Sequence, residues 1–263
     1  MRADVVLAGS GFPKLRSAIT LLRSEGMSIL VDTGFVEDRP RLQGALSELG
    51  VAPESVDVVV ATHLHYDHCG NHLLFPRARW IVGALDYADT RGFMAAYHAD
   101  PTPTKSFAAD TLRRRNEVIK EYYVRSIVRE VTRNLEFYEA VHSGNGPFEP
   151  LTAPLALTSE VEILETPGHT PGHLAVLARG AEVRGLPDPI DLLVAGDAIF
   201  NRAALHETRA ASASAPLHLA ADEVLYRQTQ RSLLDRYAYV VPGHDELVDR
   251  TTPRRDLVLG RAS

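Results

Sequence analysis

Cysteine is almost absent from this chain, since Cys69 is the only one among 263 residues. A single cysteine cannot form an internal disulfide, so nothing in the sequence requires an oxidising compartment. An excess of basic residues is also missing, because 28 lysines and arginines face 34 aspartates and glutamates and give a formal net charge of −6. A general affinity for nucleic acid is therefore not expected.

Long apolar runs are missing as well. No stretch is long enough to span a membrane, and the first residues, Met1–Asp4, lead into a strand pattern and not into a signal peptide. We therefore expect a cytoplasmic protein without a membrane partner. Apolar residues nevertheless make up 45% of the chain. That is enough for the core of one large sandwich domain or of two small ones.

The histidines that are present have an unusual arrangement. Within six residues, His63-Leu64-His65-Tyr66-Asp67-His68 offers three imidazoles and one carboxylate. This string directly follows the apolar, β-branched run 56–61, which predicts a buried strand. Imidazole and carboxylate ligands suit zinc, and also iron or manganese. A metal site at the end of this strand is therefore predicted.

Three more segments repeat this arrangement of an apolar strand followed by a potential ligand. His169 follows the strand pattern at 161–164, while Asp197 and His244 end similar apolar runs. Nearby glycines allow the backbone to turn tightly at these points. Four strands would thus bring seven candidate ligands to one rim: His63, His65, Asp67, His68, His169, Asp197 and His244.

These segments, with Asp32-Thr33-Gly34 as an early hairpin signature, occur in an order that resembles the metallo-β-lactamase superfamily. The resemblance covers about the whole length, apart from a central segment. It implies an α/β fold, a four-layer αββα sandwich that holds metals at one edge of its two sheets. It also implies two divalent metal ions, with zinc as the expected metal.

The resemblance implies a role for each candidate ligand. His63, His65 and His169 would hold one metal ion. Asp67, His68 and His244 would hold the second, and Asp197 would bridge both. Two metal ions would make hydroxide available near neutral pH and polarise the substrate oxygen. Asp67 and Asp197 are the catalytic residues of this scheme, in which Asp67 carries a proton to the leaving group.

Three residues close to these ligands are expected to have other roles. His173 lies four residues after His169 and is expected to pack behind it. Cys69 is expected to be a small buried side chain. Asp32 is expected to orient a ligand, because a metal-bound imidazole needs an acceptor on its other nitrogen.

The resemblance narrows the reaction to hydrolysis of a small-molecule ester, most of all a lactone. Lactonases that open acyl-homoserine lactones are similar in their ligand set and in a terminal Gly-His-Asp, here Gly243-His244-Asp245. Many of them carry a tyrosine three residues after the bridging aspartate, where this chain has Phe200, which lacks a hydroxyl to donate. A thioesterase similar to glyoxalase II, and a phosphodiesterase or nuclease, are the alternatives.

Other branches of the family fit less well. Oxygen-reducing diiron members carry glutamate where this chain has His65, and true β-lactamases usually lack the bridging carboxylate that Asp197 would supply. A non-enzymatic hypothesis, in which the metals only stabilise the fold or regulate a partner, is disfavoured by the intact ligand set.

One segment, at about 86–146, departs from the minimal family pattern and is predicted to be a helical insertion in a single domain, residues 1–263. Apolar residues recur every three or four positions from Asp110 to about His142, which predicts one long helix or two. Its basic face is interpreted as solvated, with a lid or a homodimer arm as the alternative. The residues of that face are Arg125, Arg129 and Arg133.

The remaining pattern predicts a few regular elements and one long loop. The loop, 201–219, is either a cover over the site or a mobile segment, with His206 and His218 interpreted as surface histidines. The predicted elements are strands at 4–8, 17–22, 27–31 and 79–82 and a helix at 38–50.

Overall fold

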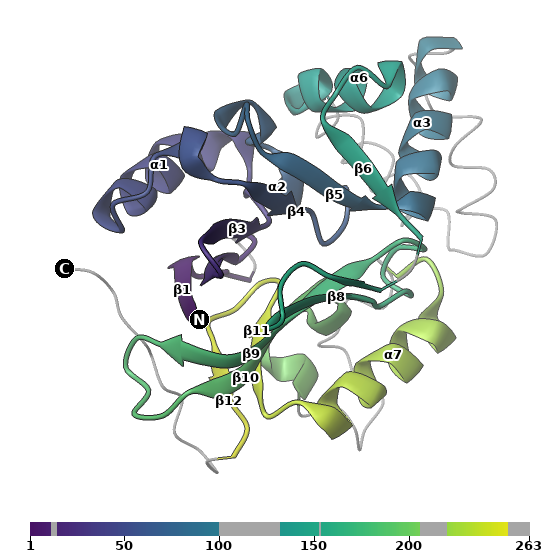
Figure 1. Cartoon of the computed structure of the whole chain (residues 1–263). Helices are drawn as coiled ribbons and strands as arrows, with labels where there is room; N and C mark the ends of the chain where they lie inside the picture. Colours follow the sequence, from purple (N-terminus) through teal and green to yellow (C-terminus); the bar gives the residue numbers. More distant parts are fainter. Residues whose placement is uncertain (12–14, 100–131, 153, 206–219, 252–263) are drawn as a thin grey trace.

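The described strands form one continuous sheet that divides into two halves (Figure 1). The computed structural model describes residues 1–263 except 12–14, 100–131, 153, 206–219 and 252–263. The first half contains, in spatial order, β1 (Arg2–Leu7), β2 (Ile19–Ser24), β3 (Met27–Val31), β4 (Val58–Val60), β5 (Arg79–Gly83) and β6 (Phe148–Leu151). The second half contains β7 (Leu155–Ala156), β8 (Val161–Glu165), β9 (Leu174–Val183), β10 (Ile190–Gly196), β11 (Tyr239–Pro242) and β12 (Val248–Asp249).

The two halves join along a short seam. There β1 pairs in parallel with the last residues of β9, with Arg2 opposite Glu182 and Ala3 opposite Val183. The described α-helices are α1 (Arg39–Glu48), α2 (Tyr66–Cys69), α3 (Ala84–Ala99), α6 (Leu135–Ser143) and α7 (Glu223–Arg236). Short 3₁₀ turns lie at Val36–Asp38, Pro53–Ser55, His72–Leu74, Asp197–Ile199 and Arg202–Leu205.

Three apolar cores separate four layers of structure. One core lies between the first half of the sheet and helices α1, α3 and α6, and it includes Trp80 and Phe137. A second lies between the two halves of the sheet, and a third lies between the second half and α7. Figure 1 shows α3 and α6 on one side of the sheets and α7 on the other. This order confirms the predicted αββα layers.

The central strands are apolar on both faces because both faces are covered. In β3, Leu30 faces the helices, while its neighbours Ile29 and Val31 face the other half of the sheet. Strand β4 repeats the alternation, with Val59 on the helix side. Each fully buried side chain of this kind contributes roughly 1.5–3 kcal/mol relative to leaving it exposed. Near-continuous apolar runs such as 56–61 are therefore what a doubly covered strand requires.

The predicted elements lie close to the observed ones, with shifted ends. Strand β1 begins at Arg2, before the predicted start, because Arg2 pairs with Arg23 of β2. The turn between β2 and β3 consists of Glu25 and Gly26, whose φ angles are 50° and 80°. Positive φ at both positions gives the twist that a two-residue hairpin needs.

The predicted insertion is described only at its two ends. Helix α3 precedes residues 100–131, and α6 follows them, so most of the helix predicted from Asp110 lies outside the described residues, together with Arg125 and Arg129. Arg133 is described, and its Nε lies 3.6 Å from Oε1 of Glu37. His206 and His218 also lie outside the described residues, as does most of the 201–219 loop. The single domain with a helical insertion therefore stays a prediction.

Among the described helices, none is both long and apolar enough to cross a membrane.

The end of β5 lies unusually close to the loop that follows β8. A Cβ atom on Gly83 would lie 1.7 Å from the carbonyl oxygen of Gly172, so only glycine allows this approach. Gly83→Ala should therefore lower the free energy of unfolding by about 3 kcal/mol or more, because the backbone fixes the positions of both the Cβ and the carbonyl oxygen and neither can rotate away. Denaturant unfolding measures the change.

Gly44 provides the matched control for that substitution. It lies exposed in α1, and a Cβ there would meet nothing within 4 Å. Gly44→Ala should raise the free energy of unfolding by roughly 0.5–1 kcal/mol, because alanine favours the helix. Equal effects of the two substitutions would contradict the close approach at Gly83.

Candidate metal centre

The seven predicted ligands lie together beyond the ends of four strands. Strands β3, β4 and β5 are parallel, and so are β10 and β11, so the carboxyl ends within each group lie at one edge. The loop after β4 carries His63 and His65, the short helix α2 that follows it carries Asp67 and His68, and the loop between β8 and β9 carries His169. Asp197 and His244 directly follow β10 and β11. The fold therefore brings the candidate ligands of both halves of the sheet to a common rim.

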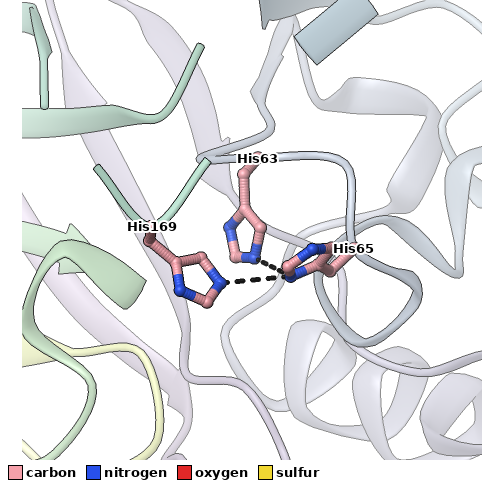
Figure 2. Close-up of side chains that lie close together, drawn as sticks. All are labelled: His63, His65 and His169. Atoms are coloured by element: carbon pink, nitrogen blue, oxygen red, sulfur yellow. Dashed lines mark hydrogen bonds between the residues drawn. The ribbon is translucent and has the colours of Figure 1, made fainter. Parts of the chain in front are cut away.

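Three histidines form the first cluster (Figure 2). Nδ1 of His65 lies 2.9 Å from Nε2 of His63 and 3.1 Å from Nε2 of His169. His63 and His169 are buried, whereas His65 is half-buried. Three ring nitrogens thus converge on one small volume from two separate loops.

A carboxylate and two histidines form the second cluster. Oδ2 of Asp67 lies 3.8 Å from Nε2 of His68 and 3.5 Å from Nε2 of His244. All three side chains are buried. Ligand atoms about 2 Å from a tetrahedral ion lie about 3.3 Å from one another. The spacing of both clusters is close to that value, so either could hold a divalent ion.

Asp197 lies between the two clusters. Its Oδ2 is 3.3 Å from Nε2 of His169, which belongs to the first cluster. Its Oδ1 is 3.4 Å from Nε2 of His68 and 3.3 Å from Nε2 of His244, which belong to the second. One carboxylate oxygen therefore faces each cluster.

Several buried atoms at this point lack hydrogen bonds. Nε2 of His68, Oδ1 of Asp197 and Nε2 of His244 are buried and have no hydrogen-bond partner among the described residues. Leaving such atoms unsatisfied costs about 1–3 kcal/mol each, and more for charged groups. A cation between them would satisfy all three atoms at once, so the residues present fit a divalent metal.

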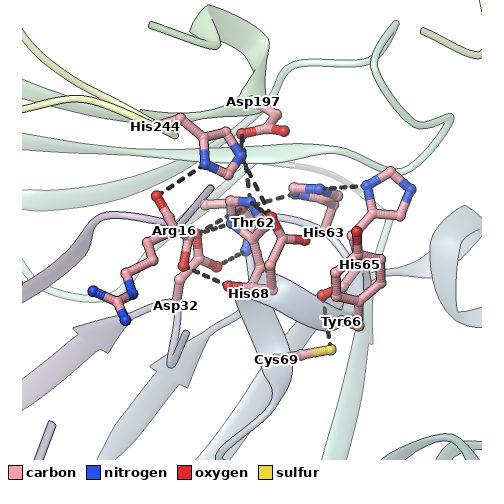
Figure 3. A network of polar contacts seen from close by, with 12 residues as sticks. Arg16, Asp32, Thr62, His63, His65, Tyr66, His68, Cys69, Asp197 and His244 are labelled. Carbon is pink, nitrogen blue, oxygen red and sulfur yellow. Dashed lines mark hydrogen bonds and ion pairs between the residues drawn. The ribbon is translucent and has the colours of Figure 1, made fainter. Parts of the chain in front are cut away.

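Residues around the second cluster fix its histidine rings (Figure 3). Nδ1 of His68 lies 2.7 Å from Oδ2 of Asp32, which also accepts a hydrogen bond from the hydroxyl of Thr62. Nδ1 of His244 donates to the carbonyl oxygen of Arg16 over 2.9 Å. In each ring the second nitrogen remains free for a metal. Asp32 therefore orients a candidate ligand, as the sequence predicts.

The charges around the clusters set opposite pKa shifts. Burial lowers the pKa of His63 and of His169 well below the usual value, so both rings are neutral at neutral pH. Burial would also lower the pKa of His68, but the carboxylates of Asp32, Asp197 and Asp67 outweigh it and raise that pKa well above the usual value. Burial would raise the pKa of Asp197, but the surrounding histidines hold it well below the usual range.

The nearby residues that were not predicted as ligands remain outside both clusters. His173 is buried, stacks on His63 with a ring separation of 5.0 Å, and places Nδ1 2.8 Å from the hydroxyl oxygen of Thr166. Burial lowers the pKa of His173 to about 3. Cys69 is fully buried and donates to the carbonyl oxygen of His65.

Sequence reasoning missed four polar residues that contact the ligand loops. Each of them forms a hydrogen bond to a backbone group or a hydroxyl of a residue in or next to the candidate-ligand segments. None of them belongs to a recognisable sequence motif. They are Ser17, Asp86, Asn134 and Tyr138.

The carboxylate of Asp32 should control the charge of His68. In the metal-free protein, Asp32→Asn should lower the pKa of His68, because the ring loses its 2.7 Å anionic neighbour while the side chain keeps its shape. NMR titration of the histidine rings measures this shift. His72, whose pKa burial lowers to about 4, is the internal reference and should not change. An unchanged His68 pKa would contradict the electrostatic role of Asp32.

Comparison with known sequences identifies a family. The sequence model of the metallo-beta-lactamase superfamily matches residues 13–244. An uncharacterised protein of Caenorhabditis elegans is 21% identical over 236 residues, which are 89% of this chain and 48% of that protein. An N-acyl homoserine lactonase of a Bacillus species is 27% identical over 180 residues, 60% of this chain and 56% of the lactonase. The chain thus spans about half the length of these curated relatives.

Comparison with solved structures agrees on the fold. A suggested metallo-beta-lactamase from Thermotoga maritima superposes with a TM-score of 0.60 at 19% sequence identity. The superposition covers 94% of this chain and 98% of that one. With the family match over residues 13–244 and the layers described above, these findings place the chain in the metallo-β-lactamase superfamily, to which it belongs.

Proposed function

We propose that this chain is a metal-dependent hydrolase that opens a carboxylic ester, specifically a lactone, at a two-metal centre. The observation that carries the proposal is the position of Asp197, whose two carboxylate oxygens face two separate groups of ligands. A carboxylate held in this way suits a bridge between two cations. Superfamily membership supports divalent metal binding and hydrolysis in general terms.

The proposed assignment gives each ion three protein ligands and the shared carboxylate. His63, His65 and His169 would hold the first ion. Asp67, His68 and His244 would hold the second. Zinc is the proposed metal, because it binds well to histidine nitrogens combined with one or two carboxylates. When bound, the ions would supply an activated water near neutral pH and polarise the ester carbonyl.

Two aspartate side chains would have further roles at the centre, one in moving a proton and one in orienting a histidine ligand. Asp67 is buried, and its Oδ2 faces His68 and His244. Its Oδ1 is the atom that would carry a proton to the leaving alkoxide. Asp32 keeps the ring of His68 in place through Nδ1, so that Nε2 points toward Asp197.

Phe200 bears on the choice of substrate. Its ring lies 4.3 Å from that of His244, and its side chain is buried. The backbone of His244 also donates to the carbonyl oxygen of Phe200. Phe200 therefore supports a candidate ligand and has no hydroxyl to offer a substrate. A lactone carbonyl would have to be polarised by the metal centre alone.

The Bacillus relative named N-acyl homoserine lactonase supports a lactone over the other esters, although the match covers 60% of this chain. The basic residues that a phosphodiesterase would need lie mostly in the segment outside the described residues. A thioester remains an alternative with the same attack on a carbonyl carbon. All three bond types therefore belong in one substrate panel.

The metal assignment predicts a specific pattern of metal loss. The purified protein supplied with zinc should contain two ions per chain by elemental analysis. Asp197→Ala should weaken both sites, because one side chain joins them, and His169→Ala should weaken one. His173→Ala should keep both ions, because its ring stacks behind the cluster. A loss of metal in His173→Ala but not in His169→Ala would overturn the ligand assignment.

The reaction is tested by hydrolysis of an acyl-homoserine lactone, a thioester and bis(p-nitrophenyl) phosphate by the zinc-loaded protein. The lactone should be turned over fastest, and Asp197→Ala should abolish its turnover. Phe200→Tyr should leave lactone hydrolysis intact or raise it, because a hydroxyl would be added close to the metal centre. Turnover of the phosphodiester alone would contradict the proposed ester chemistry.

A further inference from the structure

Helix α6 holds the loop that carries His63 and His65. The hydroxyl of Tyr138 donates to the carbonyl oxygen of Leu64 over 3.0 Å, and Nδ2 of Asn134 donates to the carbonyl oxygen of Tyr66 over 2.7 Å. Tyr138 and Asn134 are both buried. The carbonyl of Leu64 belongs to the peptide bond of His65, whereas the carbonyl of Tyr66 belongs to the peptide bond of Asp67. Tyr138 of α6 therefore holds the backbone of His65, and Asn134, the residue directly before α6, holds the peptide that follows Tyr66.

Helix α3 holds the other loop of the same cluster. Oδ2 of Asp86 accepts a hydrogen bond from the hydroxyl of Thr170 over 2.7 Å, and its Oδ1 accepts one from the backbone nitrogen of Gly172 over 2.6 Å. Thr170 directly follows His169 in the chain. Asp86 is 4% exposed, and burial raises its pKa to about 6. Burying a carboxylate costs free energy, and these two hydrogen bonds offset part of that cost.

The two helices form one unit. Phe93 and Met94 of α3 share a buried core with Phe137 and Val141 of α6. Nε2 of His98 also lies 2.7 Å from Oε1 of Glu139 across the pair. Figure 1 shows α3 and α6 next to each other, with β6 running from beneath α6 along the side of α3. A shift of either helix would therefore be passed to the loop that the other one holds.

The second cluster is held by a different part of the molecule. The hydroxyl of Ser17 donates to the carbonyl oxygen of Asp67. Asp32 contacts His68, and the carbonyl oxygen of Arg16 accepts from His244. These supporting residues lie near the start of β2 and the end of β3. Neither helix of the α3–α6 pair contributes these contacts.

We propose that α3 and α6 act as a clamp that sets the geometry of the three-histidine cluster, with Asp86 and Tyr138 as positioning residues. The clamp would determine how tightly the first ion binds, while the second ion depends on β2 and β3. This inference rests on the proposed two-metal assignment. It adds that the two sites can be weakened independently, and that the helices beside the 100–131 segment control one of them.

Binding of ¹¹³Cd²⁺ to the full chain tests the clamp, because NMR resolves ions in different ligand environments. In the unchanged protein two resonances are expected. In Tyr138→Phe and Asp86→Asn, the resonance of the nitrogen-rich site should weaken first in competition with a chelator. Its affinity should fall about tenfold, the lower end of the effect of residues that support ligands. The other resonance should be unchanged.

Two matched variants separate a local effect from a general one. Tyr87 also lies in α3, and its ring packs near that of Phe148. Tyr87→Phe removes only its hydroxyl, so this variant should change the affinity of neither site. Ser17→Ala removes the corresponding support from Asp67 and should weaken the other resonance. If Asp86→Asn does not fold, Tyr138→Phe decides the test alone, since it removes one oxygen atom.

The outcomes also separate this inference from the proposed function. A single resonance in the unchanged protein would contradict the two-metal centre itself. Two resonances that respond equally to Tyr138→Phe, or that do not respond at all, would overturn the clamp and leave the two-metal centre in place. Selective loss of the ion at the second site, the one held by Asp67, His68 and His244, in Tyr138→Phe would also overturn it.

Discussion

The arrangement of the site depends on one buried carboxylate, that of Asp197. A buried charge of this kind is tolerated only when opposite charges or hydrogen bonds compensate for lost water. Here His68, His169 and His244 lie within 3.3 to 3.4 Å of its oxygens. The three histidines come from separate segments in both halves of the sheet. The contacts of one carboxylate thus link elements that the sheet joins only along a short seam.

Backbone close to Asp197 has little room for change. A Cβ on Gly243 would lie 1.9 Å from Oδ1 of Asp197, and a Cβ on Gly196 would lie 2.7 Å from the side chain of Thr62. Gly196 also has a φ of 51°, which side chains other than glycine rarely adopt. The glycines seen beside the ligands in the sequence therefore serve two needs, a turn after the strand and space for the carboxylate.

The resemblance to the superfamily predicts the four layers, and local patterns predict that the candidate ligands gather at one rim. Doubly covered strands appear as apolar runs, and residues such as His63 and His244 directly follow such runs. The contacts behind the proposed clamp could not be predicted, because Asp86 and Tyr138 contact groups 74 to 86 residues away in the chain. Contacts of this kind leave no periodic signal. The sequence shows that Phe200 lacks the hydroxyl of a tyrosine, but its packing against His244 is visible only in the structure.

His65 differs from the other six candidate ligands in being only half-buried. An ion can leave a site only as fast as its ligands can move aside, and a side chain with solvent beside it moves more readily than one enclosed by the core. At equal affinity, an ion held by His65 as proposed would therefore have the shorter residence time. The centre would then contain one ion that exchanges with its surroundings and one that remains through many such exchanges.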